Sequence, residues 1–464
     1  MNKKLSLSLA VAALLVAVLA CSFGGASTAT PTAVPPSPPT VPATANPVPT
    51  TSSSGAVNIV STNSFVDQYG YFNLVGEITN NTDSTISSVE LEVQLADASG
   101  NTLLTDDSGN PIPSDQAYPF LDAIGPGDSS PFVYSFDTSQ GTPATYNVTV
   151  VSEQTISSER ASLDTDNVQI VSDNSGTYYL SGELVNQGDQ WAHISNLAGG
   201  VLNDANDILS AGQTGTYTSE LAPTGDASGR DRTPFVVDFS DPGGNVSQWS
   251  LWWDAEVDNS AMDYPVVVNL TNGYFDDLGD FHVVGTLTNN ADQPLNTIAV
   301  AGLYGADGTV LDADYEFSPY PLPVGVDVPF DISYFGNVNY NQSQANLVDS
   351  YTVQVDEWNT YPPSSDYASL SSTDETIQKD TAQWTVNGTF VNSSTSNVSG
   401  VTVLVAVYDA QNNLVATGNS YITPNGNFFT SNDTGSYSIT IYFDPNADLS
   451  GYHTETTVVG DVYH

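Results

Sequence analysis

The sequence predicts an all-β protein made of four tandem β-sandwich domains, and three observations support this prediction. One nine-residue segment occurs four times, with copies about 100 residues apart, which is the size of a small domain. Within each copy, aromatic, polar and aliphatic residues alternate, a pattern typical of a half-buried strand. Further alternating stretches between the copies are separated by turn residues and lack helical periodicity. The four copies cover residues 72–80, 178–186, 281–289 and 384–392.

The composition indicates a folded and strongly acidic protein. Of its 464 residues, 53 are Asp or Glu and only 6 are Lys or Arg, so the formal net charge is −47. Phosphate binding requires a basic surface, and this charge therefore excludes nucleic acid as a partner. Aromatic residues make up 10% of the chain, whereas disordered acidic sequences are poor in them. We therefore expect hydrophobic cores.

Residues 1–21 are predicted to be a lipoprotein signal peptide. Lys3 and Lys4 precede an apolar run that is too short to cross a bilayer, as in an export signal. The run ends at Cys21, the only cysteine of the chain. Residues 18–21 resemble the lipobox of bacterial lipoproteins, which implies cleavage before Cys21 and attachment of lipid to it. The alternative is an ordinary secretory signal with a chance cysteine.

Residues 22–55 are predicted to be a disordered linker. This stretch consists mainly of Pro, Thr, Ser, Ala and Val, a composition that favours extended polyproline conformations and acts as a semi-rigid spacer. Such a spacer would hold the folded domains away from the membrane to which Cys21 is attached. A flexible tail without a role is the alternative.

The rest of the chain is expected to fold as one sandwich per repeat. In the first repeat the lead strand is followed by a second alternating strand at 89–95, and residues 97–100 close a hairpin. The fourth repeat copies this strand at 401–407, the third slips by one residue near Leu303, and the second is weakest. The predicted domain bounds are 56–160, 161–259, 260–361 and 362–464.

A later strand in each repeat begins with an aromatic motif. Pro131-Phe132, Pro234-Phe235 and Pro329-Phe330 match one another, and residues 427–429 (Asn-Phe-Phe) take this place in the fourth repeat. A closing alternating strand follows. Short strands at regular spacing in units of this size predict an immunoglobulin-like sandwich. Short linkers between the units predict limited hinge motion.

The recurring segment resembles the signature of the FxLYD domain family. The resemblance covers most of residues 57–464, although the Tyr of the family name is replaced by Ala96 in the first repeat and is also missing from the second. It implies an immunoglobulin-like sandwich on exported bacterial proteins, without catalytic residues or an established ligand. The matching residues are Phe72, Leu74, Gly76, Glu77, Asn80 and Asp97 in the first repeat, and Trp384, Val386, Gly388, Asn392, Val407, Tyr408 and Asp409 in the fourth.

No residues occur with catalytic spacing, and we predict that the chain is not an enzyme. It contains four histidines but neither a His-Glu-x-x-His nor a Gly-x-Ser-x-Gly motif. His282 falls at an outward strand position and is expected to be solvated. Carboxylate pairs are abundant in so acidic a chain, so none is singled out as an acid and base.

One acidic string has part of the spacing of a calcium-binding loop. Asp444, Asn446 and Asp448 would supply the first ligands, but Leu449 stands where such a loop needs glycine. Glu455, the last ligand, would be carried away by the closing strand. We therefore predict no metal and no other cofactor, with calcium at these residues as the alternative.

Three tryptophans are candidates for stacking on a ligand. Trp249 and Trp253 are expected to point inward, which leaves Trp252 facing outward. Trp191 and Trp358 lie in predicted turns or linkers. An exposed indole can stack on a sugar ring or contact a protein partner. Scattered exposed aromatic residues without a role are the alternative.

These observations together lead to one functional hypothesis. We expect a non-catalytic protein, anchored by lipid at Cys21 in the bacterial cell envelope, with its domains on the extracellular side. It would act as a stalk or interaction module for an unknown protein or glycan. A carbohydrate-binding surface protein and a surface protein made rigid by calcium are the alternatives.

Overall fold

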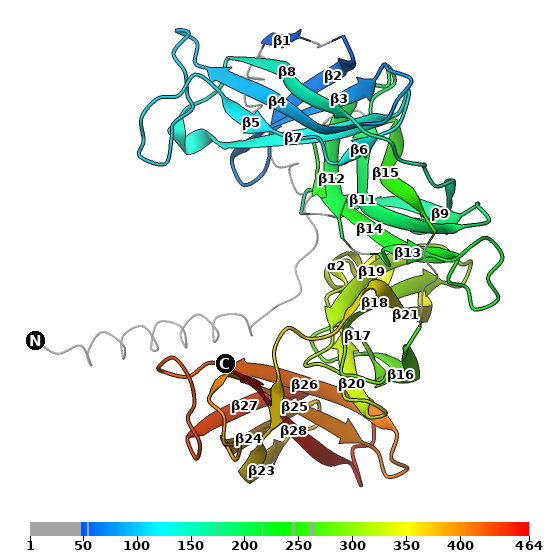
Figure 1. The fold of residues 1–464 in the computed structure, drawn as a ribbon, viewed down its shortest axis with the longest axis vertical. Coiled ribbons are helices and arrows are strands. Elements are labelled where there is room, and N and C mark those ends of the chain that lie inside the picture. The colour runs from blue at the N-terminus through cyan, green and yellow to red at the C-terminus, as the bar shows by residue number, and fades with distance from the viewer. Residues whose placement is uncertain are drawn as a thin grey trace, which may run out of the picture. The chain divides into compact units, whose positions relative to one another are not determined.

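The computed structural model describes residues 48–52, 55–173, 175–215, 217–243, 246–259 and 264–463, and nearly all of their regular elements are strands (Figure 1). The predicted signal peptide, Cys21 and most of the predicted linker lie outside the described residues. The described strands pair into eight sheets, two in each repeat. The predicted fold, four tandem immunoglobulin-like β-sandwiches, is confirmed for this part of the chain.

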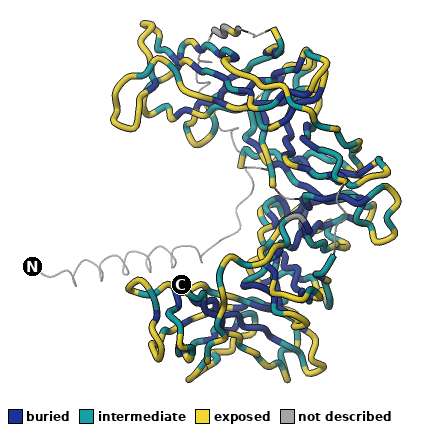
Figure 2. Tube along the Cα trace, viewed as in Figure 1, coloured by how far each residue is buried: buried dark blue, intermediate teal, exposed yellow. Residues whose placement is uncertain are grey.

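In every repeat the recurring segment is the central strand of a three-stranded antiparallel sheet, here called the motif sheet. Its inward residues, such as Leu74 and Phe72, are buried in the core of their own sandwich. Figure 2 shows buried stretches, in dark blue, along the strands of the sandwiches. The motif sheets consist of β2 (Val57–Val66), β3 (Tyr71–Asn80) and β7 (Ser129–Asp137); β9 (Leu163–Ser172), β10 (Thr177–Asn186) and β14 (Arg232–Ser240); β16 (Val266–Phe275), β17 (Phe281–Asn289) and β20 (Asp327–Ile332); and β23 (Ser371–Lys379), β24 (Gln383–Val391) and β27 (Thr434–Tyr442).

The second sheet of each repeat is built around the alternating strand that follows the recurring segment. The second sheets consist of β4 (Ile86–Ala96), β5 (Asp115–Ala117), β6 (Ala123–Ile124) and β8 (Thr145–Thr155); β11 (Trp191–Leu202), β12 (Ile208–Thr214), β13 (Glu220–Leu221) and β15 (Gln248–Asp258); β18 (Asn296–Gly305), β19 (Val310–Phe317) and β21 (Val348–Tyr361); and β22 (Tyr367–Ser369), β25 (Val398–Tyr408), β26 (Leu414–Ile422) and β28 (His453–Val462). Two short helices, α2 (Gly336–Tyr340) and α3 (Gln342–Ala345), interrupt the third repeat.

The end of the predicted linker is a strand, which corrects the prediction of a disordered segment for residues 48–52. Strand β1 (Val48–Ser52) pairs in parallel with β8, at the edge of the second sheet of the first repeat. An edge position tolerates Pro49. Proline has no N–H group to donate, and an edge strand is hydrogen-bonded to a neighbour on one side only. The unpaired edge of β8 therefore binds the chain just before the first sandwich.

The motif glycine explains why the two sequence motifs recur together. In the first repeat, Gly76 lies directly opposite Phe132 in the sheet, and a Cβ added to Gly76 would lie 2.3 Å from Cζ of that ring. Glycine thus lets the aromatic ring cover the neighbouring strand. The equivalent pairs are Gly182–Phe235, Gly285–Phe330 and Gly388–Tyr437.

The fourth of these pairs corrects the sequence analysis. Tyr437, and not a residue of the segment 427–429, stands opposite the motif glycine of the fourth repeat. Phe429 instead packs edge-on against Phe390 in the core, with ring centroids 5.2 Å apart. The Pro-Phe signature is absent from this repeat, and for that reason the sequence pattern selected the wrong aromatic segment.

The asparagine that ends each copy is buried and holds two loops together. The side-chain amide of Asn80 donates to the carbonyls of residues 84, 124 and 125, and its Oδ1 accepts from the N–H of Thr82 at 2.9 Å. Buried carbonyls need a donor, so this amide replaces the strand pairing that ends here. The recurring asparagine is therefore structural. Its counterparts with similar bonds are Asn186, Asn289 and Asn392.

The one-residue slip near Leu303 is a bulge shared by three repeats. The pairing of β18 with β19 shifts between Leu303 and Tyr304. Equivalent shifts occur between Val201 and Leu202 and between Val407 and Tyr408. A bulge inserts one residue and increases the local twist, so the apparent irregularity in the sequence belongs to the fold.

Candidate functional site

Consecutive sandwiches meet through the same two faces at all three junctions of the compact unit Asn46–His464. The outer face of one motif sheet packs on the second sheet of the next repeat. Strand β12 contacts β2, β3 and β7; strand β19 contacts β9, β10 and β14; and β26 contacts β16, β17 and β20. Outward residues such as Val75 and Val284 are consequently buried in clusters that include residues of the neighbouring repeat.

The two sheet faces without a neighbouring repeat are polar. On β4 the outward residues are Glu90, Glu92 and Gln94, and each is at least partly exposed. On β24 the outward residues Thr385, Asn387 and Thr389 are partly exposed as well. Terminal units of a stacked array need a polar outer face to stay soluble. The first and fourth repeats therefore each have one polar sheet face on which no described repeat packs.

Trp252 is buried at the first junction, which corrects the prediction that it is exposed. Its side chain points away from its own core, as the alternation required, but only 8% of the residue is exposed. It joins the core cluster of the first repeat, and its indole Nε1–H donates to Glu77 Oε1 at 3.3 Å. Trp249, which was expected to point inward, is instead the exposed tryptophan of this strand. Trp252 thus cannot stack on a ligand.

A buried ion pair also crosses the first junction. The Asp254 carboxylate accepts hydrogen bonds from the Arg160 guanidinium and, at 2.9 Å, from the backbone N–H of Ala123. Arg160 also donates to the carbonyl of Trp253 at 3.0 Å. Burial raises the pKa of Asp254, and Arg160 opposes that shift. Asp254 of the second repeat therefore bonds both to the segment between the first two sandwiches and to the first sandwich.

The second junction is the most polar. The carbonyl of Val310 accepts hydrogen bonds from Ser181 Oγ at 2.6 Å and from Gln169 Nε2 at 2.8 Å. The motif residue Glu183 accepts from Tyr304 at 3.1 Å and from Arg232 at 3.0 Å. The glutamate of the recurring segment therefore contacts the next repeat here, as Glu77 does at the first junction.

His282 is buried near the third junction, which corrects the prediction of a solvated histidine. Its ring lies between Asp331, at 2.9 Å from Nδ1, and Asp276, at 3.5 Å from Nε2, and it stacks on Tyr274. Tyr274 in turn donates to the carbonyl of Tyr442 in the fourth repeat at 3.1 Å. Burial lowers the pKa of His282, but the hydrogen bond and charge of Asp331 and the charge of Asp276 outweigh burial and raise it overall.

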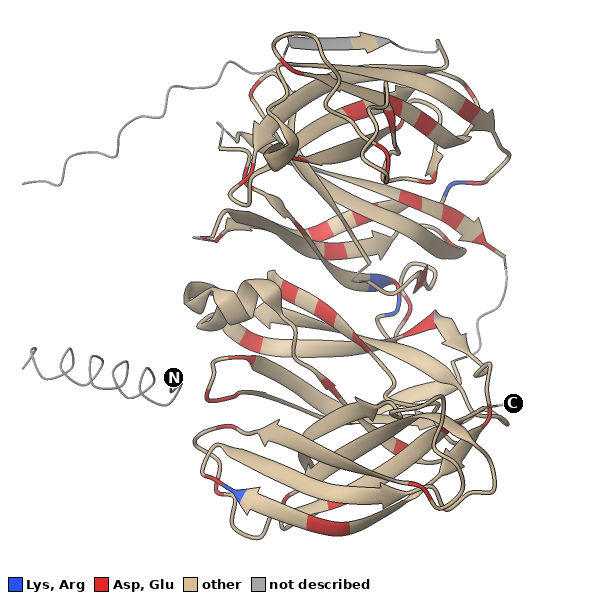
Figure 3. Ribbon diagram, turned by 90° about the vertical axis from the view of Figure 1, so that its left-hand side faces the viewer, with Lys and Arg blue, Asp and Glu red and all other residues tan. Residues whose placement is uncertain are grey.

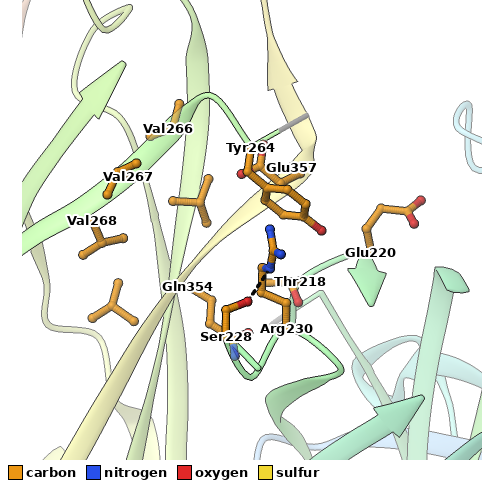
Figure 4. A pocket seen from close by; sticks show the side chains of 12 residues that line it. Thr218, Glu220, Ser228, Arg230, Tyr264, Val266, Val267, Val268, Gln354 and Glu357 are labelled. Carbon is orange, nitrogen blue, oxygen red and sulfur yellow. Dashed lines mark hydrogen bonds between the residues drawn. The ribbon is translucent and has the colours of Figure 1, made fainter. Parts of the chain in front are cut away.

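A cleft of about 490 Å³ opens beside the second junction (Figure 4). On one side it has an apolar wall that includes Val266, Val267 and Val268, and Tyr264 and Arg230 lie across from this wall. The remaining lining residues are Thr218, Glu220, Ser228, Val353, Gln354, Val355 and Glu357. They come from two repeats, so the cleft exists only because the two sandwiches are joined.

An aromatic and cationic stack forms one part of this cleft. The Arg230 guanidinium lies 3.7 Å from the centroid of the Tyr264 ring, and Trp191 packs on the same ring with centroids 5.6 Å apart. Arg230 also bonds to Asp226 and Ser228. Trp191, predicted as a stacking residue, is therefore half-buried beside the cleft and supports Tyr264. Trp191 is the first residue of β11, and its contact with Tyr264 of the next repeat has no signal in the sequence.

Carboxyl groups with raised pKa values lie in or beside the cleft. Burial, with the charge of Asp356, raises the pKa of Glu357 to about 8. Burial also raises the pKa of Glu220, against the opposing effect of His193, whose Nδ1 lies 2.8 Å away. No regularity in the sequence marks Glu357 or Glu220, because both are placed by the packing of two repeats. Sequence reasoning missed this site.

The other predicted residues lie apart from the cleft. Asp444 and Asp448 accept hydrogen bonds from the backbone N–H groups of Asn446 and Ser450 in an exposed turn. Within the described ranges, no group of three or more His, Cys, Asp or Glu side chains has a metal-binding arrangement. The side chain of Trp358 lies outside the described part of the structure.

Comparisons with known proteins return only distant similarities. No protein-family model and no curated protein matches the chain. The native conformation of E. coli alpha-2-macroglobulin is 10% identical, with a TM-score of 0.13, over 87% of this chain and 28% of that chain. The form activated by porcine elastase is 9% identical, with a TM-score of 0.12, over 87% of this chain and 44% of that chain. A Salmonella alpha-2-macroglobulin mutant is 8% identical, with a TM-score of 0.13, over 85% and 29%. This chain spans less than half the length of each of these proteins.

Proposed function

We propose that this protein is a non-catalytic, lipid-anchored cell-surface protein of tandem FxLYD-like domains that acts as a stalk or interaction module. The observation that carries the proposal is the repeated junction, in which a motif sheet packs on the next second sheet three times. A stalk must transmit position from one domain to the next, and buried contacts such as Trp252 with Glu77 restrict hinge motion. The polar outer faces of the first and fourth repeats are compatible with display in water.

The charge distribution supports a surface location. Acidic residues are spread over all four sandwiches and basic residues are few (Figure 3). A large net charge keeps a displayed protein soluble and separate from its neighbours. In the described part of the chain, no helix has the length and apolar character needed to cross a bilayer. In this proposal the lipid on Cys21 supplies the attachment. The carbohydrate-binding and calcium-dependent alternatives remain predictions.

Spin labels test the rigidity that a stalk requires. In the full-length protein, Ser99 and Gln411 are replaced by cysteines that carry the spin labels. Both residues lie in exposed hairpins, in the first and fourth repeats. We expect one narrow distance distribution by double electron–electron resonance, and a broader one when Trp252→Ala is added. A broad distribution in the parent protein would contradict the stalk.

A separate experiment tests the anchor. Detergent-phase partitioning of the full-length protein should place it in the detergent phase, and Cys21→Ala should move it to the aqueous phase. Equal partitioning of the two proteins would remove the lipid from the proposal. Turnover of any substrate on a broad hydrolase panel would contradict the non-catalytic role.

A further inference from the structure

The cleft beside the second junction contains buried polar groups without partners. Glu357 is only 7% exposed, and neither of its carboxylate oxygens has a hydrogen bond within the described residues. The hydroxyl of Tyr264, on the same cleft, also has no partner there. An unsatisfied buried polar group costs about 1–3 kcal/mol, and more for a charged group, so their presence together needs an explanation.

Around the cleft, carboxyl groups outnumber basic groups, and the charge of Arg230 offsets only part of the rise in the pKa of Glu357. Arg230 is bonded to Asp226 and Ser228 and stacked on Tyr264, and His193 lies against Glu220. The two basic side chains thus already have acidic neighbours, and Glu357 and Asp356 add two further carboxyl groups beside each other. A cation entering the cleft would complete this arrangement.

The walls indicate what kind of cation fits. Val267 and Val268, with Val353 and Val355, form an apolar wall of the cleft that Glu357 also lines. An aliphatic chain would cover these valines, and an ammonium group has three N–H donors for carboxylate and hydroxyl oxygens. An aliphatic chain that ends in an ammonium group satisfies both surfaces at once.

We propose that this cleft binds a primary ammonium group on a short aliphatic chain, with the ammonium at Glu357 and Tyr264 and the chain along the valine wall. The source is either a free alkylamine or a lysine side chain of a polypeptide. The inference goes beyond the proposed stalk role. Failure of the anchor would be seen by detergent-phase partitioning and failure of the rigid junctions by spin-label distances, whereas failure of this site would be seen by calorimetry.

Titration calorimetry of the full-length protein in nonionic detergent tests the site directly. The probe is 1,5-diaminopentane, and 1-pentanol is the control for apolar contact alone. We expect saturable binding of the amine and none of the alcohol. Glu357→Gln should weaken binding at least tenfold, whereas Glu153→Gln, the same change at an exposed glutamate of the first repeat, should leave the affinity within about twofold, the ordinary effect of a distant surface charge.

Proton release provides a readout that a merely structural role of Glu357 would not affect. The pKa of Glu357 is raised to about 8, so at pH 7 the bound ammonium should displace a proton from a large share of the Glu357 carboxyls, measured from heats in buffers of different ionisation enthalpy. The affinity should rise several-fold from pH 6 to pH 7. The groups facing Glu357 and its neighbours are Asp356, Arg230, Tyr264, Glu220, His193 and Asp258. The Glu357→Gln variant keeps all of these groups, so the pH dependence of amine binding to this variant measures their contribution without that of Glu357.

A second pair of probes separates the two sources. Nα-acetyl-lysine amide represents a polypeptide lysine, and its Nε-acetylated form is the neutral control. Tighter binding of the diamine assigns the site to free amines, and tighter binding of the lysine derivative assigns it to a protein partner. Three results would each overturn the proposal. They are binding of 1-pentanol as tight as that of the diamine, unchanged affinity for the diamine in Glu357→Gln, and a Glu357-dependent heat of the same size with calcium chloride.

Discussion

Removing Arg160 should destabilise the first junction through the carboxylate that it leaves behind. In the ion pair the Arg160 side chain is 19% exposed and that of Asp254 is 3% exposed. Arg160→Met keeps most of the length and apolar contact of the side chain and removes the charge. Loss of one partner of a buried pair costs about 3–5 kcal/mol, because the other charge remains buried. Arg160 is partly solvated and the N–H of Ala123 still bonds to Asp254, so we expect about 3 kcal/mol.

The pH dependence identifies the cause of this loss. Burial already raises the pKa of Asp254 in the presence of Arg160, and Arg160→Met should raise it further. The folded state then binds a proton more tightly than the unfolded state, so part of the lost stability returns as the pH falls, by up to about 1.4 kcal/mol per pH unit. The double variant Arg160→Met/Asp254→Asn, which buries no charge, should be more stable at pH 7 than Arg160→Met.

Urea unfolding at pH 7 and pH 5, followed by tryptophan fluorescence, measures these differences. The signal reports mainly on the second repeat, because Trp191, Trp249, Trp252 and Trp253 all lie between residues 161 and 259. A loss below about 1 kcal/mol at pH 7, the range of an exposed ion pair, would refute the reasoning. So would an equal loss at both pH values, or a double variant no more stable than Arg160→Met.

Three further predictions concern single residues. His282 should stabilise the fold below its ordinary pKa of 6.5 and lose this effect as the pH rises through its higher folded pKa; unfolding at pH 5.5 and 8 should show the difference, and in His282→Gln it should shrink. Gly76→Ala should cost about 1–3 kcal/mol because the new Cβ meets the Phe132 ring at 2.3 Å, whereas Gly109→Ala, in a turn with open space but a positive φ of 79°, should cost only about 1 kcal/mol; equal losses in urea would contradict the close-contact argument. Asn289→Ala should cost about 2–3 kcal/mol, since its amide bonds to the carbonyls of Gln293 and Leu322 are lost, and an unchanged urea midpoint would show that water replaces the amide.

The recurring segment identifies the fold and says nothing of a ligand. Its glycine accommodates an aromatic ring, its asparagine bonds to loop carbonyls, and its alternation builds the core. Each of these requirements is local to one sandwich, within reach of a strand pair or a turn. Every copy of the segment must therefore contain residues that meet these requirements, and such residues can be recognised from the sequence alone.

The sequence by itself determined the four β-sandwiches and, for strands with clear alternation such as β3 and β4, which side points toward the core. Only the tertiary structure decided which outward residues meet water. Trp252 and His282 point away from their own cores, as alternation requires, yet the neighbouring repeat or nearby carboxylates bury them. The cleft beside Glu357 arises in the same way, from two separate stretches of the chain, residues 218–268 and 353–357. Alternation reports on which side of a sheet a residue lies, whereas the contact between two sheets of different repeats depends on the complementary shape of whole faces, which no local pattern records.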